Sequence, residues 1–168
     1  MIIIGYQGIG KSTLAGKRNC IDLESGNFWV DGKRDEKWYI PYCQIANHLS
    51  QQGYTVFVSS HEVVRKELKK SEEKVYVICP RLDLKNGWIK KLEDRYLYTG
   101  TDKDFKAFMN AKNRYDENII ELMSSGFDVV VLDSMLYSLD GIVMALNLPY
   151  PELVTWHWIQ AHFVEVGE

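Results

Sequence analysis

The sequence predicts an α/β fold in which a five-stranded parallel sheet lies between two helical layers, a three-layer α/β/α sandwich. Short apolar runs rich in Val and Ile recur along the chain and alternate with longer segments of helical pattern. A length of 168 residues is sufficient for one well-buried core and too short for two ordinary domains. Residues 1–168 are therefore expected to form a single domain.

Each element of this fold is assigned from its own stretch of sequence. The first strand follows from "MIIIG", because consecutive isoleucines are typical of a parallel strand buried on both faces. The predicted strands comprise residues 1–5, 20–23, 55–59, 75–79 and 129–132. The predicted helices comprise residues 40–52, 62–70, 84–96, 104–125 with an interruption, and 141–146, and a further helix begins at residues 12–17. Pro149 and Pro151 are expected to end the last helix, and Trp156 and Trp158 to pack in the core or in an interface.

Composition narrows the cellular setting and the classes of partner. The net charge of −3 argues against a general affinity for nucleic acid or for anionic membranes. Cys20, Cys43 and Cys79 are isolated, a pattern that fits neither a disulfide framework nor a zinc site. The first strand begins at Met1 and leaves no room for a signal peptide, and no apolar run reaches membrane-spanning length. We expect a soluble cytoplasmic protein that binds neither nucleic acid nor a membrane.

The stretch "GYQGIGKS" has the spacing G-x-x-x-x-G-K-[ST] of a phosphate-binding loop, and it stands between a predicted strand and a predicted helix. Glycines allow backbone N–H groups to surround a phosphate, Lys11 supplies a cation for the β- and γ-phosphate oxygens, and the Ser12 hydroxyl is a ligand for Mg²⁺. The pattern predicts ATP and Mg²⁺ as cofactors. The residues expected to bind them are Gly5, Gly8, Ile9, Gly10, Lys11, Ser12 and Thr13.

Acidic residues follow two of the other predicted strands. Ligands of open parallel sheets bind beyond the carboxyl ends of the strands, so these residues are expected near the glycine motif. Asp22 and Glu24 lie at the carboxyl end of the second strand, and Asp133 follows the fifth. A carboxylate there can orient an acceptor hydroxyl or hold a water molecule on Mg²⁺. Asp22 is the preferred choice, with Ser12 as the other metal ligand, and Glu24 and Asp133 remain alternatives.

Longer stretches of the chain resemble the P-loop kinases of small metabolites and nucleoside monophosphates, which include adenylate, gluconate and shikimate kinases. "VYVICPRLDLKNGWIKKLEDRY" is similar to the fourth strand and lid helix of that family, and "AKNRYDENIIELM" to the segment in which the lid returns. The resemblance implies a helical lid insertion at about residues 84–114, in which Arg95 and Arg114 contact phosphates. In compactness the chain also resembles phage-encoded nucleotide kinases.

Two further stretches resemble the acceptor side of these kinases. "VFVSSHEVVRKEL" is similar to the third-strand segment of gluconate kinases, and "IDLES" to the second-strand motif of shikimate kinases. The resemblance implies that Asp22, Glu24 and Arg65 bind a small-molecule phosphate acceptor. The aspartate-glycine pair of adenylate kinases is replaced after the third strand by "SSH", so AMP is not specified as the acceptor. His61 lacks the elbow motif and the oriented acid of a hydrolase.

The resulting expectation is ATP-dependent phosphoryl transfer to a nucleotide or deoxynucleotide, with Lys11, Asp22, Arg95 and Arg114 as catalytic residues. One alternative is a metabolite kinase of the gluconate or shikimate type. Another is a P-loop regulatory ATPase that acts with a protein partner and uses Asp133. Structural roles compete with the functional ones, because arginines can be surface ion-pair residues and acids at strand ends can cap turns.

Overall fold

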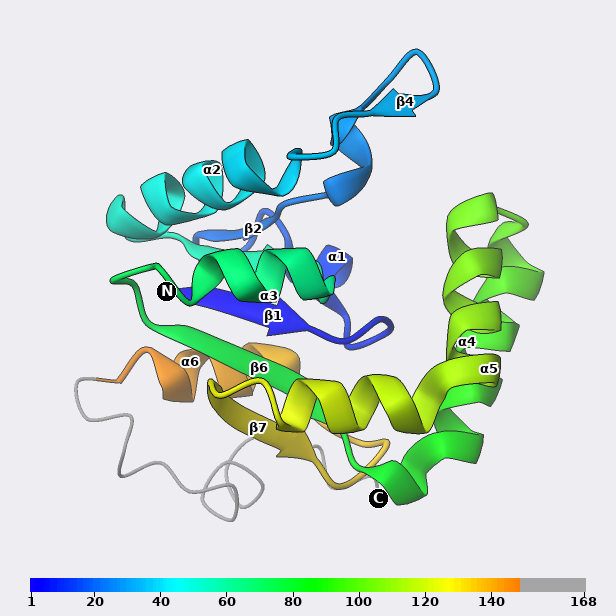
Figure 1. Cartoon of the computed structure of the whole chain (residues 1–168). Helices are drawn as coiled ribbons and strands as arrows, with labels where there is room; N and C mark the ends of the chain where they lie inside the picture. Colours follow the sequence, from blue (N-terminus) through cyan, green and yellow to red (C-terminus); the bar gives the residue numbers. More distant parts are fainter. Residues whose placement is uncertain (149–168) are drawn as a thin grey trace.

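The computed structural model describes residues 1–148, which form an α/β fold around one parallel sheet (Figure 1). The sheet has the strand order β2-β5-β1-β6-β7. Its strands are β1 (Ile2–Gly5), β2 (Cys20–Asp22), β5 (Thr55–Val58), β6 (Val75–Pro80) and β7 (Asp128–Leu132). Every neighbouring pair is parallel, and in the register Ile3 of β1 stands between Phe57 and Tyr76. The predicted five-stranded parallel sheet is confirmed.

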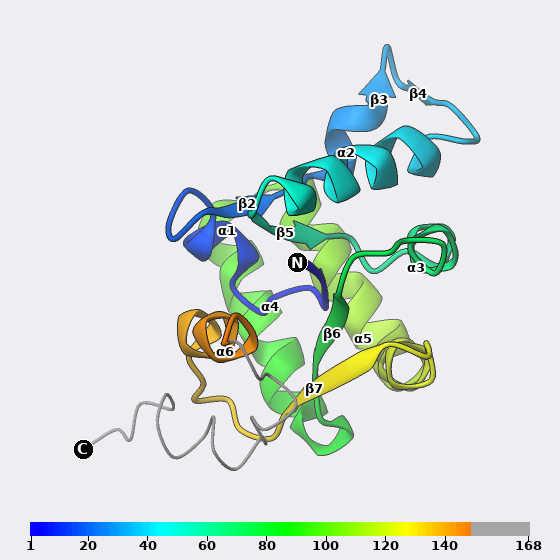
Figure 2. The same ribbon diagram turned by 90° about the vertical axis from the view of Figure 1, so that its left-hand side faces the viewer.

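Helices cover both faces of the sheet (Figure 2). One face carries α2 (Tyr39–Gln51), α3 (Glu62–Leu68) and the second half of α5, and the other carries α1 (Lys11–Leu14) and α6 (Leu139–Leu146). The central strand β1 is buried on both sides, and the side chains of its three isoleucines are inaccessible to solvent. This burial explains why its sequence is continuously apolar rather than alternating.

A helical hairpin projects from the carboxyl end of the sheet (Figure 1). It follows the short turn η2 (Leu82–Leu84) and consists of α4 (Lys85–Thr99) and α5 (Asp102–Met123). Gly100 ends α4 in the left-handed conformation, and the Thr101 side chain caps α5 by accepting a hydrogen bond from the Asp104 amide. The helix α5 kinks at Arg114, where φ is −137°. The predicted interruption is confirmed, and it separates the projecting part of α5 from the part that packs on the sheet.

Two segments differ from the sequence-based expectation. The helix expected to continue from residue 12 to 17 is wrong beyond Leu14, because Gly16, Arg18 and Asn19 all have positive φ and turn the chain directly into β2. Between β2 and α2 the structure adds the 3₁₀ turn η1 (Ser25–Phe28) and an antiparallel hairpin. The strands of this hairpin are β3 (Trp29–Val30) and β4 (Lys33–Arg34).

Other expectations have different outcomes. All three cysteines are buried and free, as the absence of a disulfide pattern predicted. Among residues 1–148, no helix combines the length and apolar character needed to cross a membrane. The expectations for Pro149, Pro151, Trp156 and Trp158 fall outside the described residues.

Candidate functional site

Residues 5–12 connect β1 to α1, and we call this segment the glycine loop. Three of its positions require glycine for steric or conformational reasons. A Cβ at Gly5 would lie 2.5 Å from Cδ1 of Ile9, so any side chain there displaces the buried isoleucine. Gly8 and Gly10 have φ of +86° and +99°, a region that other residues rarely adopt. The loop thus keeps a backbone conformation that its glycines alone permit without strain.

The glycine loop is fixed against the α4–α5 hairpin by side chains that the sequence did not single out. The indole N–H of Trp88 donates to the carbonyl of Gln7 at 2.8 Å, and the Gln7 amide donates to the carbonyl of Ala107 at 2.8 Å. The Tyr137 hydroxyl donates to the carbonyl of Gly8 at 3.4 Å. Because α4 and α5 both contact the loop, a movement of either helix will change the contacts that hold the loop in place.

Lys11, Ser12 and Asp22 lie together at the carboxyl end of the sheet. The Ser12 hydroxyl donates to Oδ2 of Asp22 at 3.0 Å, and the Lys11 ammonium donates to the carbonyl of Gly5 at 2.7 Å. Burial lowers the pKa of Lys11, and the charge of Asp22 partly offsets this effect. Burial likewise raises the pKa of Asp22, against the opposing effects of Lys11 and Ser12. The site therefore combines a cation, a hydroxyl and a carboxylate that influence one another.

The oxygen atoms of Ser12 and Asp22 are suited to supply two of the six ligands of a Mg²⁺ ion. Mg²⁺ prefers oxygen ligands and usually takes one or two from protein, with water and phosphate oxygens completing its octahedron. Within residues 1–148 there is no group of three or more His, Cys, Asp or Glu side chains that would hold a metal by protein ligands alone. Ser12 and Asp22 suit a magnesium ion shared with bound phosphates.

The three candidate acids occupy different positions. Asp22 is in contact with Ser12, as described above. Glu24 forms an ion pair with Lys103 of α5, and this pair connects the segment after β2 to the tip region of the helical hairpin. Asp133 follows the edge strand β7, and after the larger effect of Asp83 its charge contributes to the raised pKa of Arg81. Of the three acids, Asp22 has the geometry expected for a residue that acts beside Lys11.

The three arginines proposed from the resemblance all have carboxylate partners. Arg95 pairs with Asp104 at 2.7 Å within the α4–α5 hairpin, and its charge reaches Lys11, whose pKa it helps to lower. Arg114 lies at the kink of α5, where it pairs with Glu117 at 2.8 Å. Arg65 pairs with Glu121 at 2.9 Å and donates to the carbonyl of Ser60 at 2.6 Å. Their roles in phosphate binding stay predictions, since each would have to leave or share a carboxylate.

A cluster around Arg34, which we call the Arg34 cluster, was not identified from the sequence. The guanidinium of Arg34 lies 3.3 Å from the ring centre of Trp38 and 5.7 Å from that of Trp29. His61 meets Trp38 edge-on at 5.6 Å, and its Nδ1 is 2.8 Å from the Ser59 hydroxyl. Partial desolvation lowers the pKa of His61, and so do the charges of Arg34, Arg65 and Lys11. The only local signal was "WVDGKR", whose Asp-Gly pair is typical of a tight hairpin.

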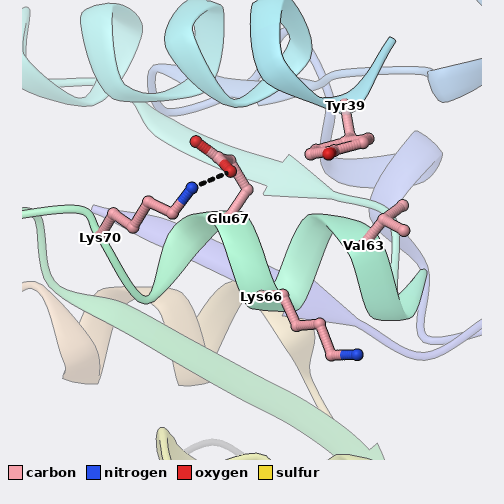
Figure 3. A pocket seen from close by; sticks show the side chains of 5 residues that line it. All are labelled: Tyr39, Val63, Lys66, Glu67 and Lys70. Carbon is pink, nitrogen blue, oxygen red and sulfur yellow. Dashed lines mark hydrogen bonds and ion pairs between the residues drawn. The ribbon is translucent and has the colours of Figure 1, made fainter. Parts of the chain in front are cut away.

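A separate shallow pocket lies between α2 and α3 (Figure 3). Its lining residues are Tyr39, Val63, Lys66, Glu67 and Lys70. Lys70 pairs with Glu67 at 2.7 Å, and Lys66 extends away from that pair and binds Glu62 at 2.6 Å. None of these residues belongs to the glycine loop or to the Arg34 cluster, and each charged residue of the lining already has an ion-pair partner.

Comparison of the sequence with family models and with curated proteins finds no match in either case. The functional assignment therefore depends on the residues of the site and on their geometry. The loop spacing, the Ser12–Asp22 contact and the position of Lys11 are the observations available for it.

Proposed function

We propose that the protein catalyses ATP-dependent phosphoryl transfer to a small-molecule acceptor, and that the acceptor is a nucleotide or deoxynucleotide. The observation that carries the proposal is the 3.0 Å contact between Ser12 and Asp22, beside Lys11, in a loop of the spacing G-x-x-x-x-G-K-S. ATP with Mg²⁺ would supply the phosphoryl group and a divalent cation to neutralise its oxygens.

Lys11 is the main cationic group of the proposed donor site. Its ammonium donates to the carbonyl of Gly5, so it lies along the loop that would surround the phosphates. Anionic phosphate beside Lys11 favours the charged form and opposes the burial that lowers its pKa. Backbone N–H groups of the glycine loop add donors that need no rearrangement during the reaction.

Asp22 is proposed to act between donor and acceptor. Its contact with Ser12 holds the carboxylate at the end of β2, on the same edge of the sheet as Lys11. The carboxylate can hold a water on Mg²⁺ or accept a proton from an acceptor hydroxyl. Where the acceptor oxygen is already an anionic phosphate oxygen, no base is needed and orientation is the remaining task.

The α4–α5 hairpin provides the proposed means of excluding water. It projects from the sheet edge that carries the glycine loop and contacts the loop through Trp88 and Ala107. Arg95 lies on this hairpin and can bring a positive charge toward the phosphates if it exchanges Asp104 for a phosphate oxygen. Movement of a helical lid is a common way to assemble such a site around its substrate.

The proposal is tested by measuring ADP formation from ATP and Mg²⁺ with a panel of acceptors. The panel contains nucleosides, nucleoside and deoxynucleoside monophosphates, and sugar acids. We expect turnover that requires one of the monophosphates. Turnover with a sugar acid alone would support a metabolite kinase, whereas slow hydrolysis unaffected by every acceptor would contradict the proposal and favour a regulatory ATPase.

A further inference from the structure

Arg34 differs from the other arginines of the chain in having no carboxylate partner among residues 1–148. Five of the six arginines form ion pairs with Asp or Glu in this part of the chain: Arg18, Arg65, Arg81, Arg95 and Arg114. A protein with an excess of acidic residues has many possible partners for one more cation. The surroundings of Arg34 should therefore explain why it has no carboxylate partner among residues 1–148.

The guanidinium of Arg34 is held in place and partly removed from water. It lies against Trp38, whose exposed fraction is 8%, with Trp29 next to it, and its Nη2 donates to the carbonyl of Ser25 at 2.6 Å. Its Nε is buried and has no hydrogen-bond partner among the described residues. Desolvation lowers the pKa of Arg34. A half-buried cation without a carboxylate partner is stabilised when an anion accepts hydrogen bonds from it.

Other groups that bind anions lie beside Arg34. His61 is exposed, follows β5 and contacts the same indole, Trp38, as the guanidinium does. Its pKa is lowered by partial desolvation and by Arg34, Arg65 and Lys11, so the charges of three cations reach this imidazole. The hydroxyl of Ser59 lies 2.8 Å from His61. This convergence of positive charge and hydrogen-bonding groups is the arrangement expected for an anion site.

We propose that Arg34, positioned by Trp29 and Trp38, and His61 form the site that binds the phosphate group of a phosphomonoester acceptor. The inference rests on the proposed function and replaces Arg65 by Arg34 as the principal contact to the acceptor phosphate. Arg65 is satisfied by Glu121 and Ser60, whereas Arg34 needs to release no carboxylate. Trp29 has an exposed fraction of 56% and offers a flat apolar surface beside the site, which suits a nucleobase.

The experiment measures acceptor binding by calorimetry without ATP or Mg²⁺. The probes are the four deoxynucleoside 5′-monophosphates, the matching deoxynucleosides and inorganic phosphate. We expect at least one monophosphate to bind, and its deoxynucleoside to bind at least about tenfold more weakly. Arg34→Gln should weaken monophosphate binding by about tenfold or more. Lys33→Gln, which removes a neighbouring exposed charge of the same hairpin, should change the affinity by less than about twofold.

A second measurement on the unaltered protein covers the case in which Arg34→Gln does not fold. Phenylglyoxal modifies accessible arginines, and peptide mapping reports the rate at each one. The monophosphate should slow modification of Arg34 and leave Arg18 unchanged. Equal affinity of Arg34→Gln and the parent, equal affinity for nucleoside and monophosphate, no binding of any monophosphate, or no protection of Arg34 would overturn the inference. ATP titration of the parent separates this result from the donor site, since failure to bind ATP contradicts the proposed function alone.

Discussion

Arg95 and Arg34 lie on two different projections of the molecule and have different kinds of partner. Arg95, on the α4–α5 hairpin, pairs with Asp104, which also accepts hydrogen bonds from Thr99 at 2.6 Å and Thr101 at 3.0 Å. Arg34, on the β3–β4 hairpin, rests against aromatic rings and one carbonyl. A phosphate must compete with the Asp104 carboxylate for Arg95. At Arg34 no carboxylate of the described residues has to be displaced.

This difference between the partners of Arg95 and Arg34 predicts how each projection should respond to a bound ligand. Exchange of a carboxylate for a phosphate changes the contacts that hold α4 to α5, so binding at Arg95 is coupled to a change in the helical hairpin. Binding at Arg34 uses a side chain already positioned by Trp38, so little movement of the β3–β4 hairpin is required. The Glu24–Lys103 ion pair joins the helical hairpin to the segment that leads from β2 into the β3–β4 hairpin. Breaking this ion pair is the step through which we expect a change in the helical hairpin to reach the β3–β4 hairpin.

The largest effect is expected for Lys11→Ala, because Lys11 is the main cation of the proposed donor site. Loss of this cation should lower ATP-dependent turnover by about 10³-fold, with only a small change in the unfolding temperature. ADP formation and thermal unfolding measure the two quantities. Lys17→Ala removes an exposed lysine that has no ion pair within residues 1–148 and should keep the parent rate. Normal turnover of Lys11→Ala would exclude the loop from the reaction.

Asp22→Asn is expected to give the next largest effect, since Asp22 contacts Ser12 and its charge acts on Lys11. The amide keeps the shape of the side chain but loses its charge, so kcat and kcat/KM should fall together by about 10²-fold. The dissociation constant of ATP measured without Mg²⁺ should stay close to that of the parent. Steady-state kinetics and calorimetry test both parts. If Asp133→Asn loses activity and Asp22→Asn does not, the acid has been assigned to the wrong strand.

The sheet and the glycine loop between β1 and α1 could be predicted from sequence because their signals are local. Three successive isoleucines specify a buried strand, and the spacing of Gly5, Gly10 and Lys11 specifies the loop within eight residues. Asp22 was found because strand ends of a parallel sheet meet at one edge. The one-turn length of α1 was not predicted. Arg18 and Asn19 have positive φ, which turns the chain into β2, and their residue types do not indicate this conformation.

The cluster around Arg34 could not be predicted in the same way. Strands of two residues, such as β3 and β4, are too short to show any periodicity, so only the turn at Asp31 and Gly32 left a trace. Whether an arginine is available for a ligand depends on partners far away in sequence. Arg65 is paired with a glutamate 56 positions later, and Arg34 stands without such a partner in the described chain.

Gly10→Ala sharpens the distinction between the loop and its surroundings, with Gly16→Ala as a matched control. Both glycines have positive φ, +99° and +79°, so each alanine should lower the free energy of unfolding by about 1–2 kcal/mol. Only Gly10 belongs to the glycine loop, and its replacement should also weaken ATP binding by about tenfold because loop amides shift. A Cβ at Gly16 meets no described atom within 4 Å. Thermal unfolding and ATP titration distinguish the two, and equal ATP affinities would contradict the loop assignment.

The smallest expected effect is a change in amide hydrogen exchange. It tests the comparison most directly, because each of the two projections should respond to a different ligand. Amide hydrogen exchange in residues 84–114 should slow by about two- to fivefold with a non-hydrolysable ATP analogue, since Arg95 then links the helical hairpin to bound phosphate. Residues 29–34 should not respond to the analogue. A deoxynucleoside monophosphate should give the reverse pattern, because it binds at Arg34 and leaves the Arg95–Asp104 pair in place. If the analogue leaves exchange in residues 84–114 unchanged, the α4–α5 hairpin is a static helix pair and Arg95 a structural residue. If both ligands slow exchange in both segments alike, the Glu24–Lys103 connection makes the projections one unit, and the contrast between exchangeable and open arginines fails.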